Sequence, residues 1–135
     1  MRRHATAKWT GSGKEGNGQL TTQTGSLSGT PYNYVSRFEN GTQTNPEELL
    51  AAAHAGCFSM KLAFVLDSTG AKEREIETTC TITLDNGSIT ESHLDVKVKT
   101  SLEKEKFEAA VTEAKENCPV SKLFNTKITA TAEMI

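Results

Sequence analysis

One long apolar segment constrains the fold more than any other feature of the sequence. Residues 49–66 are strong helix formers almost throughout, and apolar side chains occupy nearly every face of the helix they would form. Just before them, Asn45 suits a helix N-cap, Pro46 suits the first helical position, and Glu47 and Glu48 complement the positive end of the helix dipole. A helix without a wide polar face is normally buried. The sequence therefore predicts a central helix that runs through the middle of the molecule.

Strand patterns lie on both sides of this helix. Residues 4–10 and 19–24 predict two strands joined by a glycine-rich turn, and residues 32–39 predict a third extended segment. Residues 73–84 and 89–101 alternate as strands do, and the Asn86-Gly87 pair between them is a strong hairpin signal. The inward face predicted for this hairpin carries Ile76, Thr78, Cys80, Ile82 and Leu84 on one strand and Leu94, Val96 and Val98 on the other.

The C-terminal part predicts a second helix and a last strand. Residues 103–117 form an amphipathic pattern whose apolar stripe ends, one turn further on, at Cys118. Pro119 disfavours helical geometry at the residue before it, which places Cys118 at a helix boundary. Residues 127–133 predict a final strand. With no internal repeat or linker, residues 1–135 are expected to form a single α+β domain.

Composition excludes several classes of protein. The formal net charge of −2 shows no basic footprint for nucleic acid. The longest uncharged apolar stretch, residues 49–60, is shorter than the roughly 20 residues that span a membrane. The basic start, Arg2, Arg3 and His4, is not followed by the apolar segment of a signal peptide. We therefore expect a soluble, cytoplasmic protein with neither a nucleic-acid nor a membrane partner.

The three cysteines point to thiol chemistry inside the cell. An odd number of cysteines without a secretion signal, and without a C-x-x-C pair, favours a reduced chain over a disulfide framework or a zinc ribbon. Cys80 lies on the inward face of a predicted strand, where a small buried hydrophobe is its ordinary role. Cys57 lies among small residues of the central helix, and Cys118 ends the apolar stripe of the second helix. The pattern leaves open whether Cys57 and Cys118 form a redox pair or belong to the core.

His54 precedes Cys57 by three residues and lies on the same helix face. A Cys–His nucleophile, or a zinc site made of His54, Cys57 and Cys118, is conceivable, but metal sites usually show more ligands. A polar spot hydrogen-bonded to backbone or solvent is the plainer interpretation. Arg37 and Glu47 also have ordinary interpretations, as an exposed arginine and a helix-start carboxylate.

Two separated motifs resemble the OsmC/Ohr family of organic hydroperoxide reductases, and more closely its OsmC branch. Residues 36–60, SRFENGTQTNPEELLAAAHAGCFSM, resemble the family signature, and residues 117–122, NCPVSK, resemble its second cysteine motif. The glycine-rich N-terminal hairpin with Trp9, the spacing of the helices and the terminal strand also fit. The resemblance covers nearly the whole chain and departs only slightly, with Gly56 standing where the family commonly has alanine.

The resemblance implies a fold, an assembly and four site residues. It implies an OsmC-like α+β fold assembled as an intertwined homodimer, with the long helices central and two active sites at the subunit interface. By motif match Cys57 is the peroxidatic cysteine, Cys118 the resolving cysteine, and Arg37 and Glu47 the polar pair beside Cys57. It further implies an organic hydroperoxide as substrate and a dithiol of the lipoyl type as reductant, with no cofactor and no metal.

The implied chemistry suits these residue types. A free cysteine is only a few per cent ionised at pH 7, and an arginine that lowers its pKa to about 6 would make the thiolate roughly 30-fold more abundant. The sulfenic acid formed at Cys57 would condense with Cys118 to a disulfide. Apolar walls provided by Leu49, Leu50 and Phe58 would favour bulky organic hydroperoxides over hydrogen peroxide.

Helix geometry adds a hypothesis about the assembly. Glu47 and Cys57 are ten residues apart, about 15 Å along one helix, so one helix cannot bring both to the same peroxide. We therefore expect Glu47 to serve the Cys57 of a partner subunit. Two other functions remain open: a non-catalytic redox sensor or ligand-binding thiol protein of the same fold, and a Cys–His hydrolase.

Overall fold

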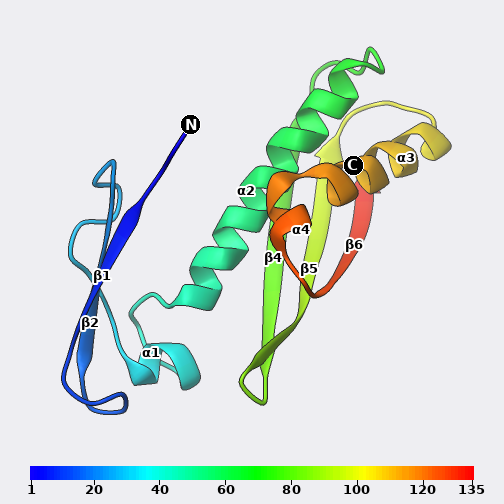
Figure 1. Ribbon diagram of the computed structural model, residues 1–135. Coiled ribbons are helices and arrows are strands. Elements are labelled where there is room, and N and C mark those ends of the chain that lie inside the picture. The colour runs from blue at the N-terminus through cyan, green and yellow to red at the C-terminus, as the bar shows by residue number, and fades with distance from the viewer. The chain divides into compact units, whose positions relative to one another are not determined.

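The computed structural model describes all 135 residues, and they form two compact units, residues 1–49 and residues 50–135. The first unit contains β1 (Ala5–Thr10), β2 (Asn17–Thr22), β3 (Thr30–Tyr32) and α1 (Tyr34–Phe38). The helix α2 (Pro46–Asp67) begins in the first unit and continues into the second. The second unit adds β4 (Glu75–Asp85), β5 (Ser88–Lys99), α3 (Lys104–Asn117), α4 (Pro119–Leu123) and β6 (Lys127–Met134). Figure 1 shows these elements in chain order.

The N-terminal unit is a small antiparallel sheet in the order β1-β2-β3. Gly18 of β2 pairs with Trp9 on one side and Tyr32 on the other, and the two rings lie 5.4 Å apart. A Cβ atom at Gly18 would lie 2.3 Å from Tyr32 Cε1 and 2.7 Å from Trp9 Cε3. Glycine is required here because the two aromatic rings pack over the backbone of the middle strand.

The extended segment predicted for residues 32–39 is wrong beyond Tyr32, because residues 34–38 form the short helix α1. Asn33 caps this helix: its side chain accepts a hydrogen bond from the Ser36 N–H, and the Ser36 hydroxyl accepts one from the Asn33 N–H, both at 2.9 Å. This reciprocal pair is a capping box built with serine in place of the usual glutamate. The box turns the chain at the position where strand propensity alone predicts that it continues.

The C-terminal unit contains a second sheet in the order β4-β5-β6, with β4 and β5 antiparallel and β6 parallel to β5. The predicted hairpin is confirmed, with Asn86 and Gly87 in the turn at φ of +50° and +78°. Both values lie in the left-handed region that a two-residue hairpin turn of this type demands. Leu94, Val96 and Val98 of β5 are fully buried, as the sequence predicts, and Ser92, which was not predicted, is buried on the same face.

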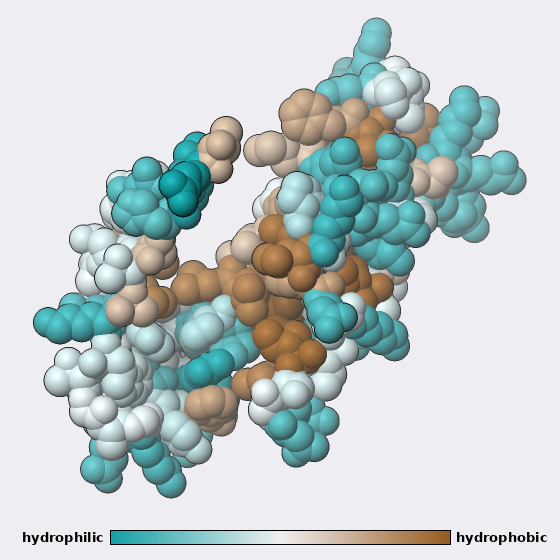
Figure 2. Space-filling view, viewed as in Figure 1, coloured by the Kyte–Doolittle hydropathy of each residue, from teal (hydrophilic) through white to brown (hydrophobic).

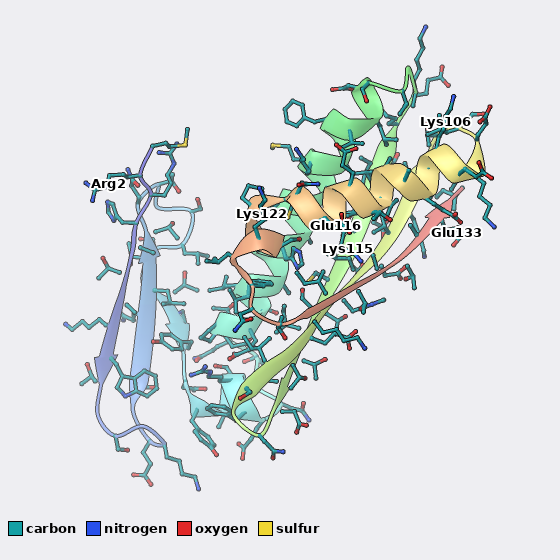
Figure 3. The ribbon with its side chains drawn as sticks, turned by 45° about the vertical axis from the view of Figure 1, so that its right-hand side comes forward. Arg2, Lys106, Lys115, Glu116, Lys122 and Glu133 are labelled. Carbon is teal, nitrogen blue, oxygen red and sulfur yellow. The ribbon has the colours of Figure 1, made fainter.

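Two helices cover one face of this second sheet. Phe58 and Leu62 of α2 and Phe107 and Val111 of α3 pack in one apolar core with the buried residues of β5. The outer side of α3 is charged, and Figure 3 shows Lys106, Lys115 and Glu116 projecting from it. The layout is therefore a two-layer α+β unit with its core between helices and sheet.

The central helix is buried on one face only within the single chain. His54, Phe58, Leu62, Val65 and Leu66 are buried, whereas Met60 and Phe64 are 66% and 65% exposed. By length and composition α2 could cross a membrane. Its packing against the β4–β5 hairpin is instead that of a core helix in a soluble fold. Figure 2 shows apolar residues exposed along α2 and α4. The expectation of complete burial is thus not met by one chain alone.

Candidate active site

The structure brings Cys57 and Cys118 together from segments 61 residues apart, and both thiols are free. Cys57 of α2 packs against the core cluster that includes Cys118, and Cys118 is near enough to raise the pKa of the Cys57 thiol. Cys118 is fully buried between α3 and α4, and it serves as the C-cap of one helix and the N-cap of the other. Pro119 occupies the first position of α4. Cys57 and Cys118 are therefore neighbours in the folded chain.

Burial raises the pKa of the Cys57 thiol. The hydrogen bond from the Val120 N–H acts in the opposite direction, and the neighbouring Cys118 raises the pKa further. A thiol whose pKa is raised by burial needs a positive group nearby to make the thiolate abundant at neutral pH. No positive group of residues 50–135 lowers the pKa of Cys57. Lys61, four residues further along α2, is not among the groups that shift it.

A cavity of about 450 Å³ adjoins Cys57. Besides Cys57, it is lined by Gly56, Met60, Lys61, Phe64, Asn117 and Pro119. The walls predicted from sequence are wrong in detail, because Phe58 is fully buried in the core and Leu50 lines a different pocket. The physical reason is the turn of the helix: neighbouring positions 57 and 58 are about 100° apart, so they face different surroundings. The apolar character of the cavity is retained, through Met60 and Phe64.

Arg37 and Glu47 also meet, within the N-terminal unit. The Arg37 Nη2 and Nε atoms donate to Glu47 Oε1 at 2.9 and 3.1 Å, and Nε also lies 3.3 Å from Oε2. The Glu47 side chain is 12% exposed and the Arg37 side chain 41%. A hydrogen bond links the start of α2, which carries Glu47, to α1, which carries Arg37: Asn45 Nδ2 donates to the Ser36 carbonyl at 2.9 Å. The carboxylate thus holds the guanidinium in a fixed orientation.

The guanidinium of Arg37 borders an aromatic cavity of about 470 Å³. The Arg37 Cζ atom lies 5.1 Å from the centre of the Phe38 ring, and the other walls are Trp9, Gly13, Tyr32, Asn33 and Tyr34. A cation held beside aromatic faces suits a partly apolar ligand that develops negative charge. The N-terminal unit therefore offers an electrophilic group and an apolar wall, whereas the C-terminal unit offers the thiols.

His54 differs from its predicted environment. It is fully buried and bonded to two side chains, with Nδ1 2.6 Å from the Ser92 hydroxyl and Nε2 2.7 Å from the Ser121 hydroxyl. The backbone or solvent partner expected from sequence is therefore wrong. Neither ring nitrogen contacts Cys57, so the Cys–His nucleophile is not formed. No group of three histidine, cysteine or acidic residues is arranged to hold a metal ion, so the zinc site is not formed either.

Sequence reasoning missed Ser92 and Ser121, although each left a signal. Ser92 occupies an inward position of β5, and a polar side chain on an apolar strand face needs a partner. Ser121 follows Cys118 by three residues, and the intervening Pro119 is a helix-start signal that predicts α4. Cys80, predicted as core, is half-buried against the core and bonded to the Ser92 hydroxyl at 3.2 Å.

The burial of His54 predicts a pH dependence of stability. Desolvation lowers the pKa of His54, so the unfolded chain binds a proton at a pH where the folded chain does not. The free energy of unfolding should therefore fall as the pH drops below about 6.5, by at most about 1.4 kcal/mol per pH unit from this group. Urea unfolding between pH 8 and pH 5 measures it. His54→Gln should lose this component, and His4→Gln, at an exposed position, should keep it. Equal pH slopes in all three proteins would contradict the assignment.

These features define a pair of thiols in a two-layer α+β unit and, in the N-terminal unit, an arginine–glutamate pair carried by α1 and the first turn of α2. The profile of the OsmC-like protein family matches residues 39–133. The chain is 38% identical over 128 residues to the peroxiredoxin OsmC of Escherichia coli, a match covering 91% of this chain and 90% of that protein. The chain therefore belongs to the OsmC-like family.

Solved structures agree with this assignment. The organic hydroperoxide resistance protein OhrB of Bacillus subtilis superposes with a TM-score of 0.63 at 27% identity, covering 98% of each chain. An OsmC-like protein of unknown function from Vibrio cholerae superposes with a TM-score of 0.72 over 98% of this chain and 99% of that one. Since its identity is 15%, the second likeness bears on the fold alone.

Proposed function

We propose that this protein is a thiol peroxidase that reduces organic hydroperoxides to alcohols, with Cys57 as the attacking thiolate and Cys118 as its disulfide partner. The observation that carries the proposal is the contact between these two free thiols beside an apolar cavity. The names of the related proteins, a peroxiredoxin and an organic hydroperoxide resistance protein, point to the same chemistry. We place the reaction in the cytoplasm, where thiols are kept reduced.

The proposed cycle has three steps. The Cys57 thiolate attacks one oxygen of the peroxide bond, the O–O bond breaks, and the alkoxide that leaves takes a proton to become the alcohol. The sulfenic acid at Cys57 then condenses with the Cys118 thiol, which forms the disulfide and releases water. An external dithiol, such as a lipoyl group, finally exchanges with the disulfide and restores both thiols.

We assign Arg37, held by Glu47, as the positive group that acts on Cys57. The guanidinium would stabilise the Cys57 thiolate and the developing alkoxide, and Glu47 would hold Arg37 in place. Because α2 is unbroken from Pro46 to Asp67, Glu47 and Cys57 of one helix are about 15 Å apart along its axis. We therefore propose that each Arg37–Glu47 pair serves the Cys57 of the partner subunit in a homodimer.

The exposed side of α2 supports a dimer. Met60 and Phe64 lie one turn apart, both about two-thirds exposed, on a helix that is apolar on nearly every face. A second copy that covered this surface would bury it. Phe64→Lys should therefore give a monomer by sedimentation equilibrium, and its peroxidase activity should be lost with the dimer. Thr112→Lys adds the same charge on the exposed side of α3 and should remain dimeric and active. A fully active monomer would refute the shared site.

Steady-state turnover separates the peroxidase from its main rival, a redox sensor or ligand-binding thiol protein. With excess dithiol, a peroxidase consumes many equivalents of cumene hydroperoxide per subunit, whereas a sensor is oxidised once and stops. The apolar cavity further predicts a higher kcat/KM for cumene hydroperoxide than for hydrogen peroxide. Consumption of a single equivalent would favour the sensor.

A further inference from the structure

The site contains a buried chain of side chains that the proposed reaction has not used. The Cys118 sulfur lies 3.3 Å from the Ser121 hydroxyl, and that hydroxyl lies 2.7 Å from His54 Nε2. The exposed fractions are 0% for Cys118, 6% for Ser121 and 0% for His54. Three polar side chains from different elements are thus joined in a region that bulk water does not reach.

We propose that His54 accepts the proton of the Cys118 thiol through the Ser121 hydroxyl when Cys118 attacks the sulfenic acid at Cys57. This inference rests on the proposed function and adds a general base for its second step. His54 is here a positioning and proton-holding residue that acts through Ser121, because it does not touch either sulfur of the new disulfide.

The hydrogen-bond geometry permits this transfer in one arrangement of protons. With Nδ1 protonated and donating to the Ser92 hydroxyl, Nε2 is free to accept from the Ser121 hydroxyl. The Ser121 oxygen can then accept from the Cys118 S–H. As the thiol proton moves to Ser121, the Ser121 proton moves to His54. The Ser121 backbone N–H, 3.4 Å from the Cys118 sulfur, donates to the thiolate that is left behind.

The surroundings of His54 keep it neutral before the reaction, so that one ring nitrogen has a free lone pair. Burial lowers its pKa, and Phe124 packs edge-on against the ring with the ring centres 5.0 Å apart. No carboxylate or cation is hydrogen-bonded to the ring. The titratable groups adjoining the chain are Cys118 between α3 and α4, Cys57 on α2, and Cys80 on β4, whose sulfur is 3.9 Å from Nδ1.

Atoms and protons are conserved in the proposed step. The Cys118 sulfur forms a bond with the Cys57 sulfur as the S–O bond of the sulfenic acid breaks and hydroxide leaves. The thiol proton stays on His54 during bond formation, and the hydroxide takes a proton from solvent in the cavity beside Cys57. His54 later releases its proton to solvent, so the products are one disulfide and one water.

The test is to time the two steps separately after one equivalent of cumene hydroperoxide. Rapid quenching with mass spectrometry follows the Cys57 sulfenic acid and then the Cys57–Cys118 disulfide, at pH values from 6 to 9. His54→Gln keeps hydrogen-bonding capacity but takes up no proton, and Ser121→Ala breaks the bridge. Both should form the sulfenic acid at the wild-type rate and form the disulfide about 10-fold or more slowly at pH 7. The difference in the rate of disulfide formation should shrink towards pH 9, because hydroxide can then take the thiol proton in place of His54.

Matched variants separate the relay from a merely structural role. Ser121→Thr keeps the hydroxyl and should have the wild-type pH profile of disulfide formation. The comparison of Ser121→Thr with Ser121→Ala therefore tests the proposal even if His54→Gln does not fold. Cys80→Ala changes the same buried cluster on the far side of the ring and should leave disulfide formation unchanged. If His54→Gln and Ser121→Ala both form the sulfenic acid and then form the disulfide with the wild-type rate and pH profile, the proton transfer through Ser121 is wrong and the proposed function still stands. Failure of the wild-type protein to form any sulfenic acid would overturn the proposed function itself.

Discussion

Replacing Cys57 by serine should reduce peroxide consumption below about one thousandth of the wild-type rate, because a serine hydroxyl is essentially un-ionised at neutral pH and cannot carry the oxygen atom away as a sulfenic acid. The measurement is single-turnover loss of cumene hydroperoxide at pH 7, with the reductant left out so that only the first step is seen. The substitution exchanges sulfur for oxygen at a half-buried position, so the fold should tolerate it.

Cys80→Ser is the matched control, since Cys80 is also half-buried and lies in the same unit. It should keep the wild-type rate, because the Cys80 sulfur contacts Ser92 and His54 and not the cavity beside Cys57. An active Cys57→Ser variant together with an inactive Cys80→Ser variant would reverse the assignment of the nucleophile.

The second large effect is expected at Arg37. If its guanidinium lowers the pKa of Cys57, Arg37→Gln should slow oxidation of Cys57 roughly 30-fold at pH 7 from the loss of thiolate alone. Without the cation the pKa of Cys57 is higher, so less thiolate is present at neutral pH. The difference in oxidation rate between Arg37→Gln and the wild type is therefore greatest at neutral pH and becomes smaller as the pH approaches 9. Stopped-flow rates of peroxide reduction between pH 5 and pH 9.5 measure both the size and the shift of the profile.

Two further variants test whether the slower oxidation of Cys57 comes from the Arg37 guanidinium. Glu47→Gln keeps the guanidinium but loosens the carboxylate that orients it, so a smaller loss of the same sign is expected. Arg74→Gln removes an arginine that pairs with Asp67 at the other end of α2 and should leave the profile unchanged. A wild-type pH profile in Arg37→Gln would show that another group ionises Cys57.

Local sequence signals predicted most of the fold. Asn45 caps α2 as expected, accepting from the Glu48 N–H at 2.7 Å, and Asn86-Gly87 forms the expected hairpin turn. These predictions succeed because the chemistry that decides them lies within a few residues. The helix α1 was missed because its capping box uses Ser36, whose side chain gives a weak signal on its own.

The candidate site was predictable in its residues and not in its surroundings. The two sequence motifs pointed to Cys57, Cys118, Arg37 and Glu47, and their catalytic roles stay a prediction; the structure pairs Arg37 with Glu47 and places Cys118 near Cys57. The cavity walls and the partners of His54 depend instead on which way a helix face turns and on contacts across 38 and 67 residues of chain. Periodicity cannot supply contacts of that range, so the pairing of His54 with Ser92 and Ser121 is seen only in the folded chain.

The most direct test of the account is to locate the disulfide formed by one equivalent of cumene hydroperoxide in the reduced protein. We predict that non-reducing peptide mapping by mass spectrometry will find the peptides of Cys57 and Cys118 joined, with Cys80 still a free thiol. A disulfide through Cys80, or stable oxidation of Cys57 with Cys118 left unlinked, would contradict the central claim that the sulfurs of Cys57 and Cys118 work as a pair.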